Sequence, residues 1–385
     1  MLIKIIVAIF IANIAIASNI ISVVKIPGNV LGIKAKSRAW MSTNFKKFST
    51  FPMVSIKTND AIANKLNYQN GTKEVSIKAI YDGKNIAFLL KWKDSTKSVI
   101  ERTSTDDFND AFGVELQTKT DTVPYVDFGD LNNEIIFYMK NANENSVDIK
   151  ENRDILSQFD YQNLNVFIKN SDEDLLPYIK EKVFLYHGFN NATRLDIKLS
   201  SITMDMIYKD EYWYGSLSKK LVDKNSNLSS GAFLVSFSLY DGKMKQRGRL
   251  RNLTPWLLVR LEGLDTGGQL AEKMNKGIVG NIANGKKIAL KNCSICHRYK
   301  QVATAPKYMA PDLSFIGGYG NIEYLKESIL NPNRVQVEDF TKTAHPNFSW
   351  NEKNEKGREV SIMPSFDWMS KSEIDDLLAF LQTLK

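Results

Sequence analysis

The sequence is poor in cysteine and histidine. Among 385 residues it has two cysteines, Cys293 and Cys296, and three histidines. Two cysteines that stand only two residues apart cannot build a disulfide framework. The few histidines also leave no arrangement of serine, histidine and aspartate from which we would predict a hydrolase.

The sequence also lacks a dense run of basic residues, although its net charge is +8. Charge therefore indicates a modest preference for acidic partners and gives no case for nucleic acid binding. Hydrophobic residues make up 43% of the chain and charged residues 24%, which is typical of a folded protein. The length is sufficient for two domains, and only the N-terminal segment is long and apolar.

That N-terminal segment, residues 1–17, has the pattern of a secretory signal peptide. One lysine precedes an apolar run, and the final Ala-Ile-Ala fits the small-x-small cleavage pattern. Asn13 interrupts the run, so the run is short for a membrane-spanning helix. We expect cleavage before Ser18 and a periplasmic mature protein. The alternative is a retained anchor, and only in that case would we expect membrane association.

Residues 18–262 have the pattern of an all-β domain. The segment 75–92 alternates apolar and polar residues on both sides of Asp-Gly, which predicts a β-hairpin. The same Tyr-Asp-Gly-Lys tetrapeptide stands at 81–84 and again at 240–243. Many short strands separated by turn signals favour a β-sandwich. Further short runs of β type lie at 111–118, 133–140, 182–187 and 193–200.

The pattern becomes helical after a predicted linker, residues 263–276. Ser370 and Glu373 form a capping-box pattern in front of a final helix. Apolar residues recur on one face of that helix, which predicts core packing. We therefore expect a small all-α domain over residues 277–385, and the stripe comprises Ile374, Leu377, Leu378, Leu381 and Leu384.

Cys293, Cys296 and His297 form a C-x-x-C-H motif. This motif suits covalent haem attachment, because two thiols can add to the two vinyl groups while the adjacent histidine reaches the iron. Zinc would need two further ligands, for which the chain offers no other cysteine. A thioredoxin-like redox pair would need a parallel βαβ pattern that we do not find. On the motif alone, chance occurrence also stays open.

Residues 277–385 resemble a class I cytochrome c domain, with several family motifs in the family's order. Gly285 stands where the family lets its first and last helices cross, with Phe380 as the aromatic partner. The segment 310–317, APDLSFIG, resembles the element whose Pro311 carbonyl accepts the ring N–H of the proximal ligand His297. In that element Leu313 would pack on the haem. Ala310 replaces the family's usual glycine.

The segment 362–366, IMPSF, resembles the loop that supplies the distal iron ligand, here Met363. The segment 327–334, ESILNPNR, is also typical of these domains. A His/Met pair closes both axial positions, so the resemblance implies one-electron transfer rather than catalysis at the iron. Met309 is the rival ligand, but it stands close to the proximal-side Pro311, and we expect it to be a packing residue.

The N-terminal domain resembles the haem-binding gamma subunit of ethylbenzene dehydrogenase and related periplasmic molybdenum enzymes of the DMSO reductase family. Such domains are β-sandwiches that hold a b haem between a methionine and a lysine. Here those positions fall at Phe128 and Arg251, neither of which can donate a lone pair to iron. A b haem in this domain is therefore an open alternative that the two substitutions disfavour. The matching pieces are Trp40, 75–94, 108–116, 124–142, 212–221, 234–243 and 247–256.

These observations favour an exported c-type cytochrome that transfers single electrons and is not itself an enzyme. Its partner would be a redox protein, such as a molybdenum oxidoreductase or another cytochrome, and the β-sandwich would dock the chain to it. The alternative is a sandwich that binds a ligand or partner, with the cytochrome as a relay. A haem enzyme is a third hypothesis, against which the Met363 ligand argues. We expect His345 in a surface loop and His187 at a strand end.

Overall fold

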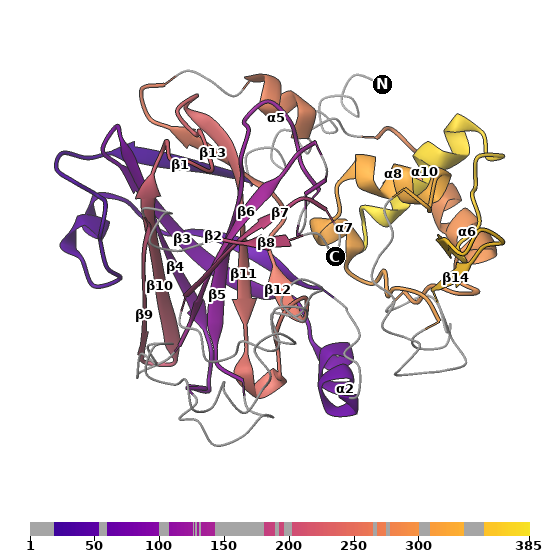
Figure 1. The fold of residues 1–385 in the computed structure, drawn as a ribbon, viewed down its shortest axis with the longest axis horizontal. Coiled ribbons are helices and arrows are strands. Elements are labelled where there is room, and N and C mark those ends of the chain that lie inside the picture. The colour runs from indigo at the N-terminus through magenta and orange to yellow at the C-terminus, as the bar shows by residue number, and fades with distance from the viewer. Residues whose placement is uncertain are drawn as a thin grey trace, which may run out of the picture.

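The computed structural model describes residues 19–53, 60–99, 108–125, 127, 129–130, 132–142, 181–188, 192–195, 202–264, 268–274, 278–299, 309–334 and 350–385. A strand-rich N-terminal domain and a largely helical C-terminal domain lie side by side (Figure 1). The predicted fold class is confirmed: a β-sandwich precedes a small α-helical domain. The predicted signal peptide, Phe128 and His345 lie outside the described residues.

The N-terminal domain is a sandwich of two mainly antiparallel layers. One layer has the order β8-β7-β6-β5-β11-β12, and the other has the order β2-β3-β4-β10-β9. The strands are β1 (Ile20–Lys25), β2 (Lys46–Met53), β3 (Lys73–Tyr81), β4 (Asn85–Lys93), β5 (Ala111–Gln117), β6 (Ile135–Asn141), β7 (Glu181–Tyr186), β8 (Ala192–Arg194), β9 (Ile202–Lys209), β10 (Tyr212–Lys220), β11 (Ala232–Tyr240), β12 (Arg251–Leu253) and β13 (Leu257–Leu261).

Two strands join the layers. β1 pairs first with β13 and then with β3, and β2 pairs first with β3 and then with β12. Aromatic side chains fill the space between the layers: the rings of Phe88 on β4 and Phe237 on β11 meet edge to face at 5.6 Å. The core is therefore built from the inward-facing residues of both layers.

The predicted hairpin is confirmed as β3 and β4. Gly83 has a φ of 97°, which glycine adopts without strain, and Asp82 accepts backbone hydrogen bonds from Lys84 and Asn85. The second Tyr-Asp-Gly-Lys differs, because it leads into the 3₁₀ turn η4 (Gly242–Met244). Asp241 caps that turn by accepting a hydrogen bond from the Met244 amide. The same tetrapeptide therefore begins a hairpin turn at one place and a 3₁₀ turn at the other.

The described strands agree with the runs expected at 111–118, 133–140 and 182–187, where β5, β6 and β7 lie. Only the first part of 193–200 is described, and β8 includes its first two residues. A short 3₁₀ helix, η1 (Arg38–Ser42), buries Trp40. Within the predicted linker lies α5 (Gly268–Met274), whose Leu270 is buried against the sandwich.

The C-terminal domain contains α6 (Ile282–Asn292), α7 (Ile316–Tyr319), α8 (Ile322–Leu330) and α10 (Lys371–Leu381), with a small hairpin of β14 (Asn351–Lys353) and β15 (Glu359–Ser361). The predicted capping box is present, since the side chains and amides of Ser370 and Glu373 bond reciprocally. The apolar stripe of α10 is buried as expected, apart from Leu384, which is partly buried. No described helix has the length and apolar character needed to cross a bilayer.

The two domains meet around α7 and the start of α8. The Pro124 carbonyl of the sandwich accepts hydrogen bonds from Trp256 Nε1 at 2.8 Å and from Asn321 Nδ2 at 3.1 Å. Asn321 also caps α8 by accepting from the Tyr324 amide, and the Tyr324 ring lies 5.2 Å from the ring of Tyr125. One asparagine therefore both begins a helix of the C-terminal domain and binds the sandwich.

Three carboxylates of the sandwich, Asp94, Asp110 and Asp241, lie with oxygens within 4.8 Å of one another. Lys73 pairs with Asp241 at 3.0 Å, and Asp110 accepts from Ser98, Gly242 and Trp213. Burial, helped by the neighbouring Asp94, raises the pKa of Asp110 to about 7.

This raised pKa predicts a pH-dependent stability. The folded protein binds the Asp110 proton more tightly than the unfolded chain, whose aspartate pKa is near 3.8. The stability from that proton is complete below about pH 4 and is lost as the pH rises through about 7. In urea unfolding from pH 4 to 8, Asp110→Asn should flatten this part of the profile, whereas the exposed Asp210→Asn should not. A slope unchanged in Asp110→Asn would contradict the assignment.

Candidate functional site

The two cysteines and His297 form one tight turn at the end of α6. The His297 amide donates to the Cys293 carbonyl at 2.8 Å, and the Cys296 amide donates to the same carbonyl at 3.2 Å. Both thiols are free and half-buried. The turn thus presents two thiols and an imidazole from five consecutive residues, in the order that a doubly attached cofactor requires.

The imidazole of His297 is held by one hydrogen bond. Its Nδ1 lies 2.8 Å from the Pro311 carbonyl oxygen, the bond that the resemblance implied. A carbonyl can only accept, so Nδ1 carries the proton and Nε2 keeps its lone pair. Burial lowers the pKa of His297, which also favours the neutral ring. A neutral imidazole fixed through Nδ1 is the form in which histidine binds a metal.

The Met363 loop is positioned by α8. The Phe366 amide donates to the Ile329 carbonyl at 3.0 Å, and Ser365 Oγ donates to the Leu330 carbonyl at 2.7 Å. Asn333 accepts from the Ser361 amide at 2.8 Å. Met363 packs on the same apolar cluster as Cys293 and Leu313. Two bonds to the end of α8 and one to the turn that follows it therefore fix the loop on either side of the thioether.

Gly285 lets α6 and α10 cross without side chains between them. A Cβ at this position would overlap the Asp376 carbonyl and would lie 2.9 Å from the Phe380 Cβ. The expected partner Phe380 is thus in contact at the crossing, and its ring lies 6.1 Å from that of Tyr299. The crossing holds α6, at the end of which the cysteine turn begins, against the last helix.

These residues fit a covalently attached haem. The chemistry of the donors matches, because the chain offers two thiols, an oriented neutral imidazole and a thioether from one domain. Leu313 lies in the apolar cluster beside Cys293, as an apolar lining requires. The rival Met309 stands two residues before Pro311, whose carbonyl binds the Nδ1 side of the His297 ring.

Comparison with protein families agrees with this geometry. The family model described as cytochrome c matches residues 282–385. Residues 282–385 form a cytochrome c domain. The model described as ethylbenzene dehydrogenase matches residues 37–149, so the first part of the sandwich is similar to that family. Both resemblances expected from the sequence are confirmed.

No curated protein matched the chain. Among solved structures, two similar chains are a family 9 carbohydrate-binding module from Caldicellulosiruptor kristjanssonii, with glucose (11% identity, TM-score 0.30, 63% of this chain and 95% of that one) and with cellotriose (9%, 0.31, 64% and 96%). A third is a protein from Bacteroides uniformis described as carbohydrate-binding (9%, 0.32, 63% and 98%). At these TM-scores the likeness supports no conclusion about this chain.

In the sandwich, Arg251 stands where the resemblance places the ligand lysine of a b haem. Its guanidinium is buried and pairs with Glu115 at 2.7 Å and with Asp127, and it donates to the Tyr240 hydroxyl at 2.9 Å. Arg249 lies 3.4 Å from the second oxygen of Asp127. Two carboxylates and two guanidinium groups thus share this site, and burial raises the pKa of Glu115 to about 7 against the attraction of Arg251.

Four further side chains of the described sandwich that carry donor atoms are paired or packed in the structure. Lys219 is fully buried and pairs with Asp223 at 3.1 Å, and His187 lies 2.6 Å from Glu134. Met139 is buried in a cluster of aromatic residues, and Lys245 lies over the Phe108 ring at 6.0 Å. His187 directly follows β7, where we expected a strand end.

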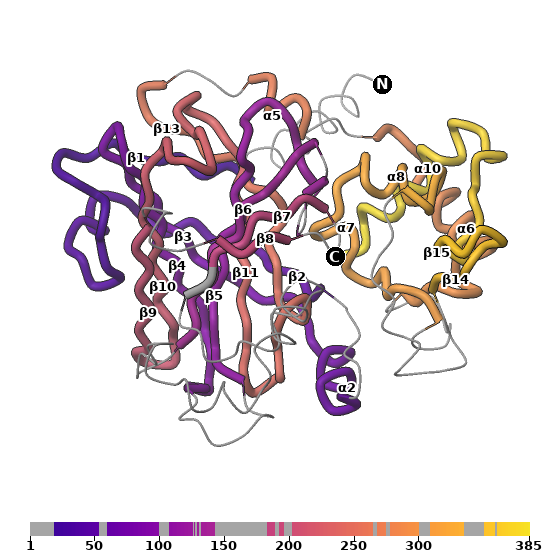
Figure 2. The backbone as a smooth tube through the Cα atoms, viewed as in Figure 1, coloured from indigo at the N-terminus to yellow at the C-terminus, as the bar shows by residue number. Residues whose placement is uncertain are grey.

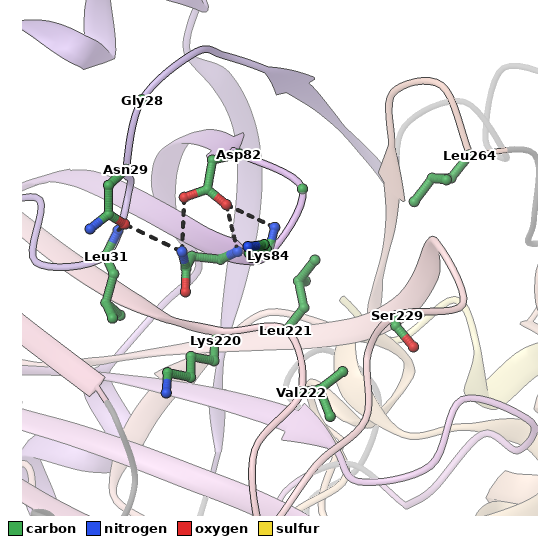
Figure 3. A pocket seen from close by; sticks show the side chains of 12 residues that line it. Gly28, Asn29, Leu31, Asp82, Lys84, Lys220, Leu221, Val222, Ser229 and Leu264 are labelled. Atoms are coloured by element: carbon green, nitrogen blue, oxygen red, sulfur yellow. Dashed lines mark hydrogen bonds between the residues drawn. The ribbon is translucent and has the colours of Figure 1, made fainter.

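A separate open pocket of about 730 Å³ lies beside the β3–β4 turn (Figure 3). Asp82 lies at its wall, but both of its oxygens accept bonds from the wall itself, namely from Val30, Lys84 and Asn85. The Asn29 side chain likewise accepts from Leu31 and Asn85. These hydrogen bonds stabilise the loops around the pocket. The lining of the pocket does not indicate a class of ligand.

Sequence reasoning missed the residues that join the domains. Asn321 reads only as a helix cap, and nothing in the sequence pairs it with Pro124. Asn333, in contrast, belongs to a segment that we had recognised as typical of the family, although its bond to the Met363 loop was not foreseen.

The helix crossing gives a direct prediction. Gly285→Ala adds a methyl group between α6 and α10, so the helices must move apart, and we expect a loss of about 1–3 kcal/mol of unfolding free energy in urea, followed by circular dichroism. Gly268→Ala is the matched control, because no atom lies within 4 Å of its Cβ position. Equal stability of the two variants would show that the crossing is not tight.

Proposed function

We propose that this chain is an exported electron carrier with one covalently bound haem c. Cys293 and Cys296 would hold the haem through thioether bonds. His297 would be the proximal iron ligand and Met363 the distal one. The observation that carries the proposal is the bond from His297 Nδ1 to Pro311, which leaves Nε2 available beside two free thiols.

Bound in this way, the haem supplies a single electron at a time, and a thioether ligand favours its reduced state. The protein supplies rigidity. The Pro311 carbonyl and the bonds that fix the Met363 loop, together with the two thioether bonds that the cysteines would form, would limit movement of the ligands between oxidised and reduced states. Small movement favours fast transfer, because little reorganisation is needed. Two protein ligands also leave no position for a substrate.

We propose that the sandwich holds no b haem and acts as a docking domain. The supporting observation is the ion-pair cluster around Arg251. A guanidinium paired with Glu115 and Asp127 cannot be exchanged for an iron ligand without leaving buried carboxylates unpaired. Lys219 and His187 have polar partners of their own, and Met139 is packed among aromatic residues. A b haem would therefore require rearrangement of buried charges.

Export and partner are parts of the same proposal. Residues 1–17 would direct the chain to the periplasm, because they have the pattern of a secretory signal peptide. The similarity of residues 37–149 to ethylbenzene dehydrogenase supports a redox partner of the molybdenum oxidoreductase type. Another cytochrome is the alternative partner.

The distal ligand gives the test. In protein loaded with haem, Met363→Ala should open one axial position, so that the iron becomes high-spin, binds carbon monoxide and has a lower reduction potential. Met309→Ala is the matched control and should keep the spectrum and the potential of the original chain. Rapid binding of carbon monoxide by the wild-type protein would contradict an iron with both axial positions occupied. A change of spectrum in Met309→Ala but not in Met363→Ala would identify Met309 as the distal ligand.

A further inference from the structure

Helix α2 (Ala61–Gln69) is fixed to the sandwich at both ends. At its start, Asp60 caps the helix through the Ala63 amide and pairs with Arg247 at 2.7 Å. At its end, Asn70 donates to the side chain of Asn252 on β12 at 2.8 Å. Figure 2 shows α2 standing out from the strands on the side of the cytochrome domain. The helix is thus a rigid projection of the sandwich.

Tyr68, in the last turn of α2, reaches the cytochrome domain. The Arg298 guanidinium lies over the Tyr68 ring, 5.3 Å from its centroid. This is the geometry of a cation–π contact, which holds a guanidinium in place and removes water from one of its faces. The two residues are far apart in the sequence, and Arg298 directly follows the proximal ligand His297.

Arg298 is tied to the segment that orients His297. Its carbonyl accepts from the Leu313 amide at 3.0 Å, and its guanidinium lies 3.9 Å from the buried Asp312 carboxylate. The hydrogen bond from His297 to the Pro311 carbonyl joins the same two segments. Residues 297–298 and 311–313 therefore form one unit, and Tyr68 touches that unit from the other domain.

We propose that Tyr68 is a positioning residue for the haem. Resting on the proposed function, the inference is that the Tyr68 ring holds the Arg298 cation beside the proximal ligand and thereby raises the reduction potential. Arg298 offsets the negative charge of the buried Asp312 carboxylate, which would by itself favour the oxidised state with its one additional positive charge. This offset weakens when the cation moves into water. The sandwich thus sets the potential of a haem that it does not bind.

The test measures the ratio of reduced to oxidised haem at a fixed solution potential. Tyr68→Leu should lower this ratio roughly threefold, because the ring that holds Arg298 is lost. Tyr68→Phe keeps the ring and should leave the ratio unchanged. Arg298→Gln should lower the ratio at least as much as Tyr68→Leu, and adding Tyr68→Leu to it should change nothing further.

A second measurement, by NMR, tests whether the Tyr68 ring holds the Arg298 guanidinium or only contributes to the packing of the two domains. In the reduced protein, the ring current of Tyr68 should shift the NMR signal of the Arg298 Nε proton upfield; Tyr68→Phe should keep this shift and Tyr68→Leu should remove it. An unchanged ratio in Tyr68→Leu, or a further fall in the Arg298→Gln background, would overturn the proposal. If Tyr68→Leu does not fold, an unchanged ratio in Arg298→Gln would overturn it equally. A chain without covalent haem would instead overturn the proposed function, and this inference with it.

Discussion

The hydrogen bond between His297 Nδ1 and the Pro311 carbonyl is the interaction on which the rest of the site depends. It selects the tautomer of the imidazole and leaves the Nε2 lone pair, which in our proposal binds the iron. The other contacts hold its two ends: the turn that contains Cys293 brings His297, and the bond between Leu313 and Arg298 brings Pro311. Without this bond, thiols and imidazole would be neighbours in sequence but would not form an oriented ligand set.

The sandwich contacts the domain that contains this site. It meets the cytochrome domain through Asn321 at the start of α8 and through Tyr68 beside Arg298. Its own buried charges, centred on Arg251, are compensated by carboxylates, and in our proposal this ion-pair cluster takes the place of the b haem that the resemblance implies. The domain has thus exchanged a cofactor role for a scaffolding role in our proposal.

The sequence predicts the local elements of the fold and several residues of the haem site, but not the contacts between the two domains. Local patterns predicted the β3–β4 hairpin, the capping box at Ser370 and the buried stripe of α10, because turn chemistry and side-chain periodicity are properties of neighbouring residues. Resemblance added the bond to Pro311. The helix α2 and the contact of Tyr68 with Arg298 could not be predicted, since they depend on how two domains pack and no short-range pattern records that. The two Tyr-Asp-Gly-Lys tetrapeptides show the same limit, because one forms a hairpin and the other leads into the η4 turn.

The most direct test of the central claim is the haem content of the purified chain, expressed together with a cytochrome c maturation system. Pyridine haemochrome spectra distinguish c haem from b haem, and their intensity gives the number per chain. Our account predicts one c haem and no b haem. A chain with no covalent haem would contradict the assignment of Cys293, Cys296 and His297, and a second haem of b type would contradict the structural role given to Arg251.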